Sequence, residues 1–103
     1  MPGTNTDSKT REQTRQKTAR PPLHKVILVN DDFTRREFVV RLLKAEFRVP
    51  EAQALGIMLT AHTKGACVVA VFTKEVAEEK ANRATDFARQ NGYPLLFTTE
   101  PEE

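Results

Sequence analysis

Residues 25–43 read KVILVNDDFTRREFVVRLL, and the change of pattern within this stretch decides how the chain folds. The apolar run VILV has the length and β-branched composition of a buried strand. Three polar residues end it, and Thr34 followed by Glu37 then matches the pattern of a capping box, which predicts a helix start. Apolar residues recur afterwards at helical spacing, so we predict a strand over 23–30 and a helix over 34–47.

A second helix is predicted after Pro50, since proline suits the first position of a helix, and it is expected to end at Gly65. Four of its residues fall at positions i, i+3, i+4 and i+7, which places them on one helical face. We expect this face to point inward; its residues are Leu55, Met58, Leu59 and His62.

The second half of the chain predicts a strand, a helix and a strand. The apolar run 66–72 is interpreted as a central strand, Thr73 as the cap of a third helix, and 94–99 as the last strand. The third helix is expected to turn a stripe of mostly small residues toward the sheet: Val76, Ala77, Ala81, Ala84, Phe87 and Ala88. The order β-α-α-β-α-β predicts an α+β fold, a three-stranded antiparallel sheet with three helices on one face, similar to the ribosomal stalk protein C-terminal domain.

Composition divides the chain near Pro21-Pro22. Residues 1–22 contain no Val, Ile, Leu or Phe and carry a net charge of +3, so we expect a disordered N-terminal extension. Residues 23–103 carry a net charge of −1 and are expected to form one folded domain, which makes nucleic-acid binding by that domain unfavourable. The single Cys67 excludes an internal disulfide, and no apolar run has the ~20 residues of a membrane span. We therefore expect a cytoplasmic monomer without membrane contact.

Asn30, Asp31 and Asp32 follow the first strand directly and allow several interpretations. They suit a polar turn, because Asn and Asp side chains satisfy nearby backbone groups. A metal site is disfavoured, because no second histidine or glutamate stands at ligand spacing. Phosphoryl chemistry of the response-regulator kind fails, because the only later aspartate, Asp86, falls within the third predicted helix.

The remaining interpretation is a receptor for the α-amino group of a peptide. That group has a pKa near 8, so it is mostly cationic in the cell and offers three hydrogen-bond donors. An amide oxygen, a carboxylate and a histidine nitrogen are matching acceptors, and His62 could supply the last one if its helix packs beside the end of the first strand. Apolar residues are available to line a pocket for the first side chain: Val39, Leu42, Met58, Ala61 and Leu95.

The order of these motifs resembles that of the ClpS family, small adaptors that deliver N-degron substrates to the ClpA unfoldase of the ClpAP protease. The similarity spans about residues 25–100. It rests on KVILVNDDFT at 25–34, EFV at 37–39, Met58-Leu59 with His62, VFT at 71–73 with Glu75 and Lys80, and PLL at 94–96.

The resemblance implies a role for each group of residues. Asn30, Asp31 and His62 would bind the α-amino group of the substrate. Glu75 and Lys80 would dock on the unfoldase, and the N-terminal extension would take part in hand-off. The entrance and walls of a pocket for a bulky first residue (Leu, Phe, Tyr or Trp) would come from Asp32, Thr34, Val39, Met58, Ala61 and Leu95. Such an adaptor needs neither catalysis nor a cofactor, so we expect no enzyme activity and no metal.

Two positions depart from the family pattern. Arg35-Arg36 stand where Pro-Met is common, and Ala61 stands where a larger valine is common. Arg36 combines a long apolar stem with a charged tip, so it would cover the pocket differently from methionine. We therefore expect an altered preference among first residues. An alternative hypothesis from another class is a ribosome- or nucleic-acid-associated module that uses the basic extension.

Overall fold

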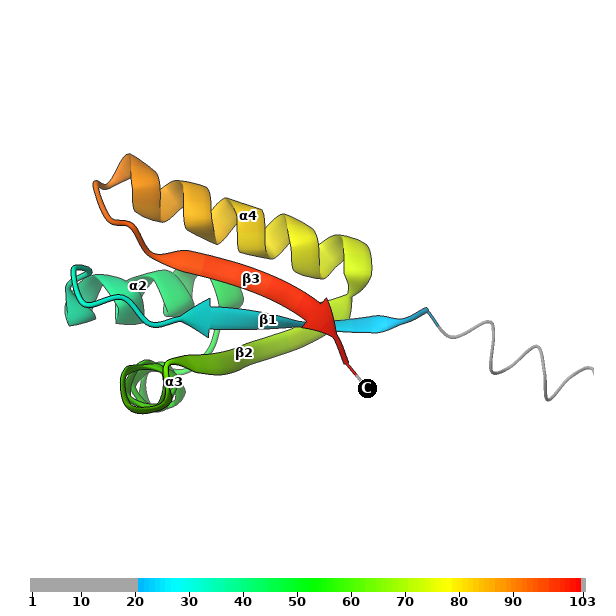
Figure 1. The fold of residues 1–103 in the computed structure, drawn as a ribbon, viewed down its shortest axis with the longest axis horizontal. Coiled ribbons are helices and arrows are strands. Elements are labelled where there is room, and N and C mark those ends of the chain that lie inside the picture. Colours follow the sequence, from blue (N-terminus) through cyan, green and yellow to red (C-terminus); the bar gives the residue numbers. More distant parts are fainter. Residues whose placement is uncertain (1–20, 103) are drawn as a thin grey trace, which may run out of the picture.

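Residues 21–102 are described by a computed structural model. Its elements are β1 (Leu23–Val29), α2 (Arg36–Phe47), α3 (Glu51–Lys64), β2 (Ala66–Thr73), α4 (Lys74–Gln90) and β3 (Leu96–Pro101) (Figure 1). The predicted disordered extension, apart from Pro21 and Pro22, lies outside the described residues. Within residues 21–102, no helix is both long enough and apolar enough to cross a membrane.

The three strands form one antiparallel sheet in the order β2-β1-β3. The predicted α+β order is thus confirmed, but the prediction that 66–72 is the central strand is wrong, because β1 occupies the centre and β2 lies at an edge. An apolar run does not reveal whether a strand has neighbours on both sides. Val68 and Val71 of β2 are exposed, so these two apolar side chains of the strand do not contribute to the core.

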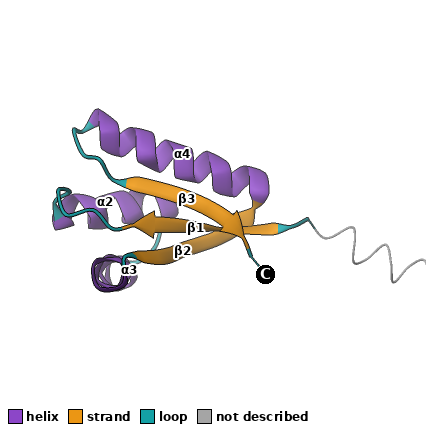
Figure 2. Cartoon of the chain, viewed as in Figure 1, coloured by secondary structure: helices purple, strands orange, loops and turns teal. Residues whose placement is uncertain are grey.

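The helices cover one face of the sheet and leave the other open (Figure 2). Val26 and Leu28 of β1, Val69 of β2 and Phe97 of β3 are all buried and belong to one continuous core with the helices. Residues of the opposite pleat, such as Leu96, remain exposed. This alternation along each strand is the pattern expected of an antiparallel sheet packed on one side only.

The predicted capping box is not formed. The cap residue of α2 is Arg35, which makes no side-chain capping hydrogen bond, and the helix begins at Arg36. The Thr34 hydroxyl donates instead to the carboxylate of Asp31. A charged acceptor makes a stronger hydrogen bond than a neutral one, so this aspartate engages the hydroxyl that the prediction assigned to the helix. Thr73 is the cap residue of α4 as predicted, but it too makes no side-chain capping bond.

The predicted inner faces of two helices are partly wrong. In α3, Leu55 and Leu59 are 41% and 49% exposed, and the buried residues are Ala54, Ile57, Met58 and Ala61. In α4, Val76 and Phe87 are exposed, and the buried residues are Ala77, Ala81, Ala84, Thr85 and Ala88. Alanine allows a helix to approach its neighbours closely, so the buried stripes include small residues, and four of the larger apolar side chains lie at their margins: Leu55, Leu59, Val76 and Phe87.

Candidate functional site

One backbone contact brings the end of β1 to the end of α3. The amide of Asn30 donates a hydrogen bond of 2.9 Å to the carbonyl of Gly65. Gly65 has a φ of 92°, a conformation that glycine adopts without strain, and its own amide caps α3 through the carbonyl of Ala61 at 2.8 Å. The last turn of α3, which carries His62, therefore lies beside the polar residues that follow β1.

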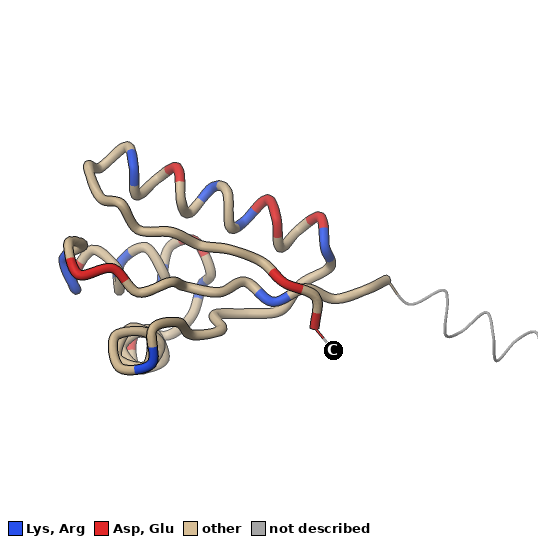
Figure 3. The backbone as a smooth tube through the Cα atoms, viewed as in Figure 1, with Lys and Arg blue, Asp and Glu red and all other residues tan. Residues whose placement is uncertain are grey.

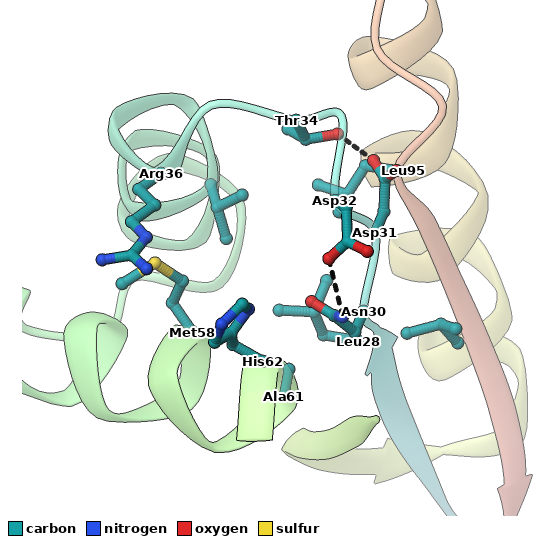
Figure 4. A pocket seen from close by; sticks show the side chains of 12 residues that line it. Leu28, Asn30, Asp31, Asp32, Thr34, Arg36, Met58, Ala61, His62 and Leu95 are labelled. Carbon is teal, nitrogen blue, oxygen red and sulfur yellow. Dashed lines mark hydrogen bonds between the residues drawn. The ribbon is translucent and has the colours of Figure 1, made fainter. Parts of the chain in front are cut away.

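A cavity of about 190 Å³ opens between these segments (Figure 4). Every residue predicted to bind the amine or shape the pocket lines it, except Leu42, which is 1% exposed in the core. The residues at the cavity are Leu28, Val29, Asn30, Asp31, Asp32, Thr34, Arg36, Val39, Met58, Ala61, His62 and Leu95. Leu28 and Val29 were not predicted. The alternation of strand residues offered a signal for Leu28, which precedes Asn30 by two positions and so points to the same side.

Asp31 organises the loop at the cavity mouth. Its Oδ1 accepts a 3.0 Å hydrogen bond from the Phe33 amide, and its Oδ2 accepts one from the Thr34 hydroxyl. This is the polar turn that the sequence allowed, in which an aspartate satisfies the backbone two residues on. Each carboxylate oxygen has a second lone pair, so the turn leaves Asp31 able to accept further hydrogen bonds.

Asn30 and His62 place two further polar groups at the same mouth. The Asn30 Nδ2 donates a long hydrogen bond of 3.4 Å to Asp32 Oδ1, which leaves the amide oxygen of Asn30 as an acceptor. His62 is exposed on the last turn of α3. The mouth thus combines an amide oxygen, a carboxylate and an imidazole. Among residues 21–102, no three His, Cys, Asp or Glu side chains are grouped closely enough to hold a metal ion.

The interior of the cavity is apolar. Four apolar residues of the interior are each at least nine-tenths buried: Val39 of α2, Met58 and Ala61 of α3, and Leu95 immediately before β3. The volume lies below the roughly 300–1,000 Å³ typical of sites for drug-sized ligands. Acceptors at the mouth and an apolar interior of this size suit one apolar side chain attached to a cationic or hydrogen-bond-donating group.

Arg36 lies at the edge of this cavity on the first turn of α2, next to Met58 (Figure 4). Arg35 is exposed and does not line the cavity. Figure 3 shows acidic (red) and basic (blue) segments of the backbone next to each other in the loop that leads into α2. Each of the two departures from the family pattern thus has a residue at the cavity: Arg36 for the first and Ala61 for the second.

Glu75 and Lys80, predicted to dock on a partner, lie on α4 and away from the cavity. Thr73, just before α4, pairs with Leu23 at the start of β1, whereas the cavity lies at the other end of that strand, about 20 Å away. Glu75 is exposed. Lys80 donates a 3.1 Å hydrogen bond to the carbonyl of Glu46, and its ammonium lies 5.7 Å from the centre of the Phe72 ring.

Comparison with known proteins gives concordant matches. A model of the family "ATP-dependent Clp protease adaptor protein ClpS" matches residues 19–98. The chain is similar to ClpS 1 adapter proteins of Bradyrhizobium diazoefficiens (67% identity over 94% of this chain and 98% of the relative) and Rhodopseudomonas palustris (67% over 92% of each). The structure of Agrobacterium tumefaciens ClpS2 bound to L-phenylalaninamide superposes with a TM-score of 0.79 at 53% identity, over 81% of this chain and all of that one.

Proposed function

Because the chain belongs to the ClpS family of Clp protease adaptors, which are not enzymes, we propose that it binds proteins through their first residue and delivers them to a ClpA-type unfoldase. The substrate would present a free α-amino group and a bulky apolar side chain. The observation that carries this proposal is the cluster of acceptors at the mouth of an apolar cavity that fits one side chain.

The α-amino group is assigned to Asn30, Asp31 and His62. An ammonium has three donors, and these side chains offer an amide oxygen, a carboxylate oxygen and an imidazole nitrogen at the same mouth. A charge-assisted hydrogen bond to the Asp31 carboxylate is stronger than one between neutral groups. The family relative from A. tumefaciens binds L-phenylalaninamide, a free amine joined to a bulky apolar side chain, which supports this assignment.

The first side chain is assigned to the apolar interior. Asp32 and Thr34 would form its entrance with Arg36, and Val39, Met58, Ala61 and Leu95 would surround it. Burial of one Leu or Phe side chain contributes about 1.5–3 kcal/mol, which is enough to discriminate a bulky apolar first residue from a small one. Two separate interactions, one with the amine and one with the side chain, thus define the substrate class.

The test is a titration with short peptides that begin with Leu, Phe, Tyr, Trp, Arg or Ala, each with a free and an acetylated N-terminus. We expect bulky apolar first residues to bind roughly tenfold tighter than Ala, and acetylation to weaken binding at least tenfold, because it removes the charge and two donors. Equal affinity for free and acetylated peptides would contradict the proposal.

Replacement of Arg36 by methionine should change which first residue is preferred. Arg36 lines the cavity next to Met58, so its exchange alters both the shape and the polarity of the entrance. We expect the ratio of affinities between at least two bulky first residues to change about threefold or more. Arg35→Met is the matched control, since Arg35 is exposed and lies outside the cavity. The same ranking in wild type and Arg36→Met would mean that Arg36 has no role in selectivity.

Docking on the unfoldase is assigned to Glu75 and Lys80, and the two residues should respond differently to mutation. Lys80 donates to a carbonyl in the last turn of α2, so Lys80→Met should weaken docking and also lower the free energy of unfolding by about 1 kcal/mol. Glu75→Gln should weaken docking alone, because Glu75 is exposed and accepts no hydrogen bond from another described residue.

Urea denaturation and binding to the isolated N-terminal domain of the unfoldase separate these effects. Glu78→Gln, another exposed acid of α4, is the control. Normal docking by both the Glu75 and the Lys80 variants would contradict the assignment of unfoldase docking to these two residues. The proposal also includes residues 1–22 as a segment used in hand-off, a monomeric adaptor and a cytoplasmic location.

A further inference from the structure

A second, larger cavity adjoins the first and is formed by the outer sides of α2 and α3. Its volume is about 570 Å³, and it shares Arg36 and Met58 with the first cavity. Its other lining residues are apolar Val40, Leu55 and Leu59 and charged Glu37, Arg41, Lys44 and Glu51. We call this second cavity the α2–α3 groove.

The groove exposes apolar side chains that are not packed into the hydrophobic core. Leu55 and Leu59 are 41% and 49% exposed, although both belong to a helix whose opposite side is packed into the core. Near the α2–α3 connection, Lys44 donates a 2.8 Å hydrogen bond to Glu51, and both residues line the groove. This contact lowers the pKa of the Glu51 carboxyl group, mainly through the hydrogen bond itself.

We propose that the α2–α3 groove is a second subsite of the adaptor, which takes an apolar side chain from the second to fourth residue of the substrate. This inference rests on the proposed function, since it requires that the first residue occupy the first cavity. Continuity supports it: Met58 and Arg36 form part of both cavities, so a peptide that leaves the first cavity on this side meets the groove directly.

The distances along α3 match the length of an extended peptide. Leu59 and Leu55 precede His62 by three and seven residues, which corresponds to about 5 and 10 Å along a helix. An extended chain advances about 3.3–3.6 Å per residue. A substrate with its amine at His62 therefore brings residues two to four alongside these leucines.

The charges around the groove favour an apolar side chain over a basic one. Lys44 and Glu51 neutralise each other, and the other charged groups lining the groove are Arg36, Arg41 and Glu37. The excess is one positive charge. A lysine or arginine at the same substrate position would therefore gain nothing from the rim and would bury less apolar surface.

The experiment measures the affinity of the full chain for peptides that begin with Phe and continue with Gly and Ser, with a single Leu at position two, three or four. Partial burial of one leucine should make at least one of these peptides bind roughly fivefold tighter than the glycine peptide. In a Leu55→Ser/Leu59→Ser variant we expect this ratio to fall to about one. Val76→Ser, which changes another half-exposed residue on α4, should keep the wild-type ratio.

Each other outcome overturns the subsite. A ratio near one at all three positions in wild type would contradict it, as would a ratio that persists in the double variant. Self-association of the wild type that the double variant loses, seen by sedimentation, would assign the groove to a second copy of the chain. If the glycine peptide itself fails to bind, the proposed function fails as well; if it binds without any leucine gain, the subsite alone fails.

Discussion

Asp31→Asn is expected to lower the affinity for a peptide with a free N-terminal phenylalanine by about a hundredfold, or about 2.7 kcal/mol. The substitution removes the negative charge of the carboxylate that is proposed to bind the substrate ammonium. It keeps an oxygen that can accept from the Phe33 amide, as Asp31 Oδ1 does at 3.0 Å. Fluorescence anisotropy with a labelled peptide measures the effect, and thermal unfolding checks that the domain remains folded.

Two control variants separate the charge of Asp31 from its role in the loop. Asp32→Asn changes an exposed carboxylate that accepts a long hydrogen bond of 3.4 Å from Asn30, so we expect less than about a fivefold loss of affinity. Thr34→Val removes the hydroxyl that donates to Asp31 and tests whether the loop needs this contact. Wild-type affinity in Asp31→Asn would exclude Asp31 as the amine receptor.

Ala61→Leu is expected to fill the first cavity and weaken binding of a peptide that begins with Phe at least about thirtyfold. Ala61 is 2% exposed and lines the cavity, so a larger side chain there occupies the space assigned to the first residue of the substrate. Because that space already exists, the domain should remain folded. The measurement is a paired titration and thermal melt of the same preparation.

Ala54→Leu is the matched control for this prediction. Ala54 is fully buried on the same helix but lines neither of the two cavities, so the larger side chain overpacks the core. We expect a loss of about 1–3 kcal/mol in unfolding free energy and little change in the affinity of the molecules that remain folded. Undiminished binding of bulky first residues by Ala61→Leu would contradict the assignment of the cavity.

The order of the elements could be predicted from the sequence, because strand and helix periodicity and turn residues are signals contained within short stretches of the chain. Gly65, for example, ends α3 as predicted, through a left-handed conformation that few other residues adopt. The rotation of α3 about its axis, which decides its buried face, could not be predicted in this way. Leu55, Met58 and Leu59 are all apolar, and their spacing fits more than one rotation of the helix. Ala54 and Ala61 decide the buried face because they permit close packing, which hydrophobicity alone does not indicate.

The site could be predicted only in part from its residues. Asn30, Asp31 and Asp32 were conspicuous as three polar residues after an apolar strand, but their proximity to His62 depends on the contact between Asn30 and Gly65, which are 35 residues apart. The resemblance to a known family supplied that proximity. Neither route anticipated that Asp31 would engage the Thr34 hydroxyl, or that Leu42 would lie in the core instead of the cavity wall.

The most direct test of the central claim is a titration of the ¹⁵N-labelled chain with phenylalaninamide, followed by amide chemical shifts. The account predicts saturable shifts concentrated at the cavity, at Asn30, Asp31, Ala61, His62 and Leu95, and none of comparable size at Glu75. N-acetyl-phenylalaninamide at the same concentrations should leave these signals in place, because it lacks the ammonium. Shifts of equal size with both compounds, or shifts confined to other surfaces, would contradict the claim that this cavity recognises a free amino group together with its side chain.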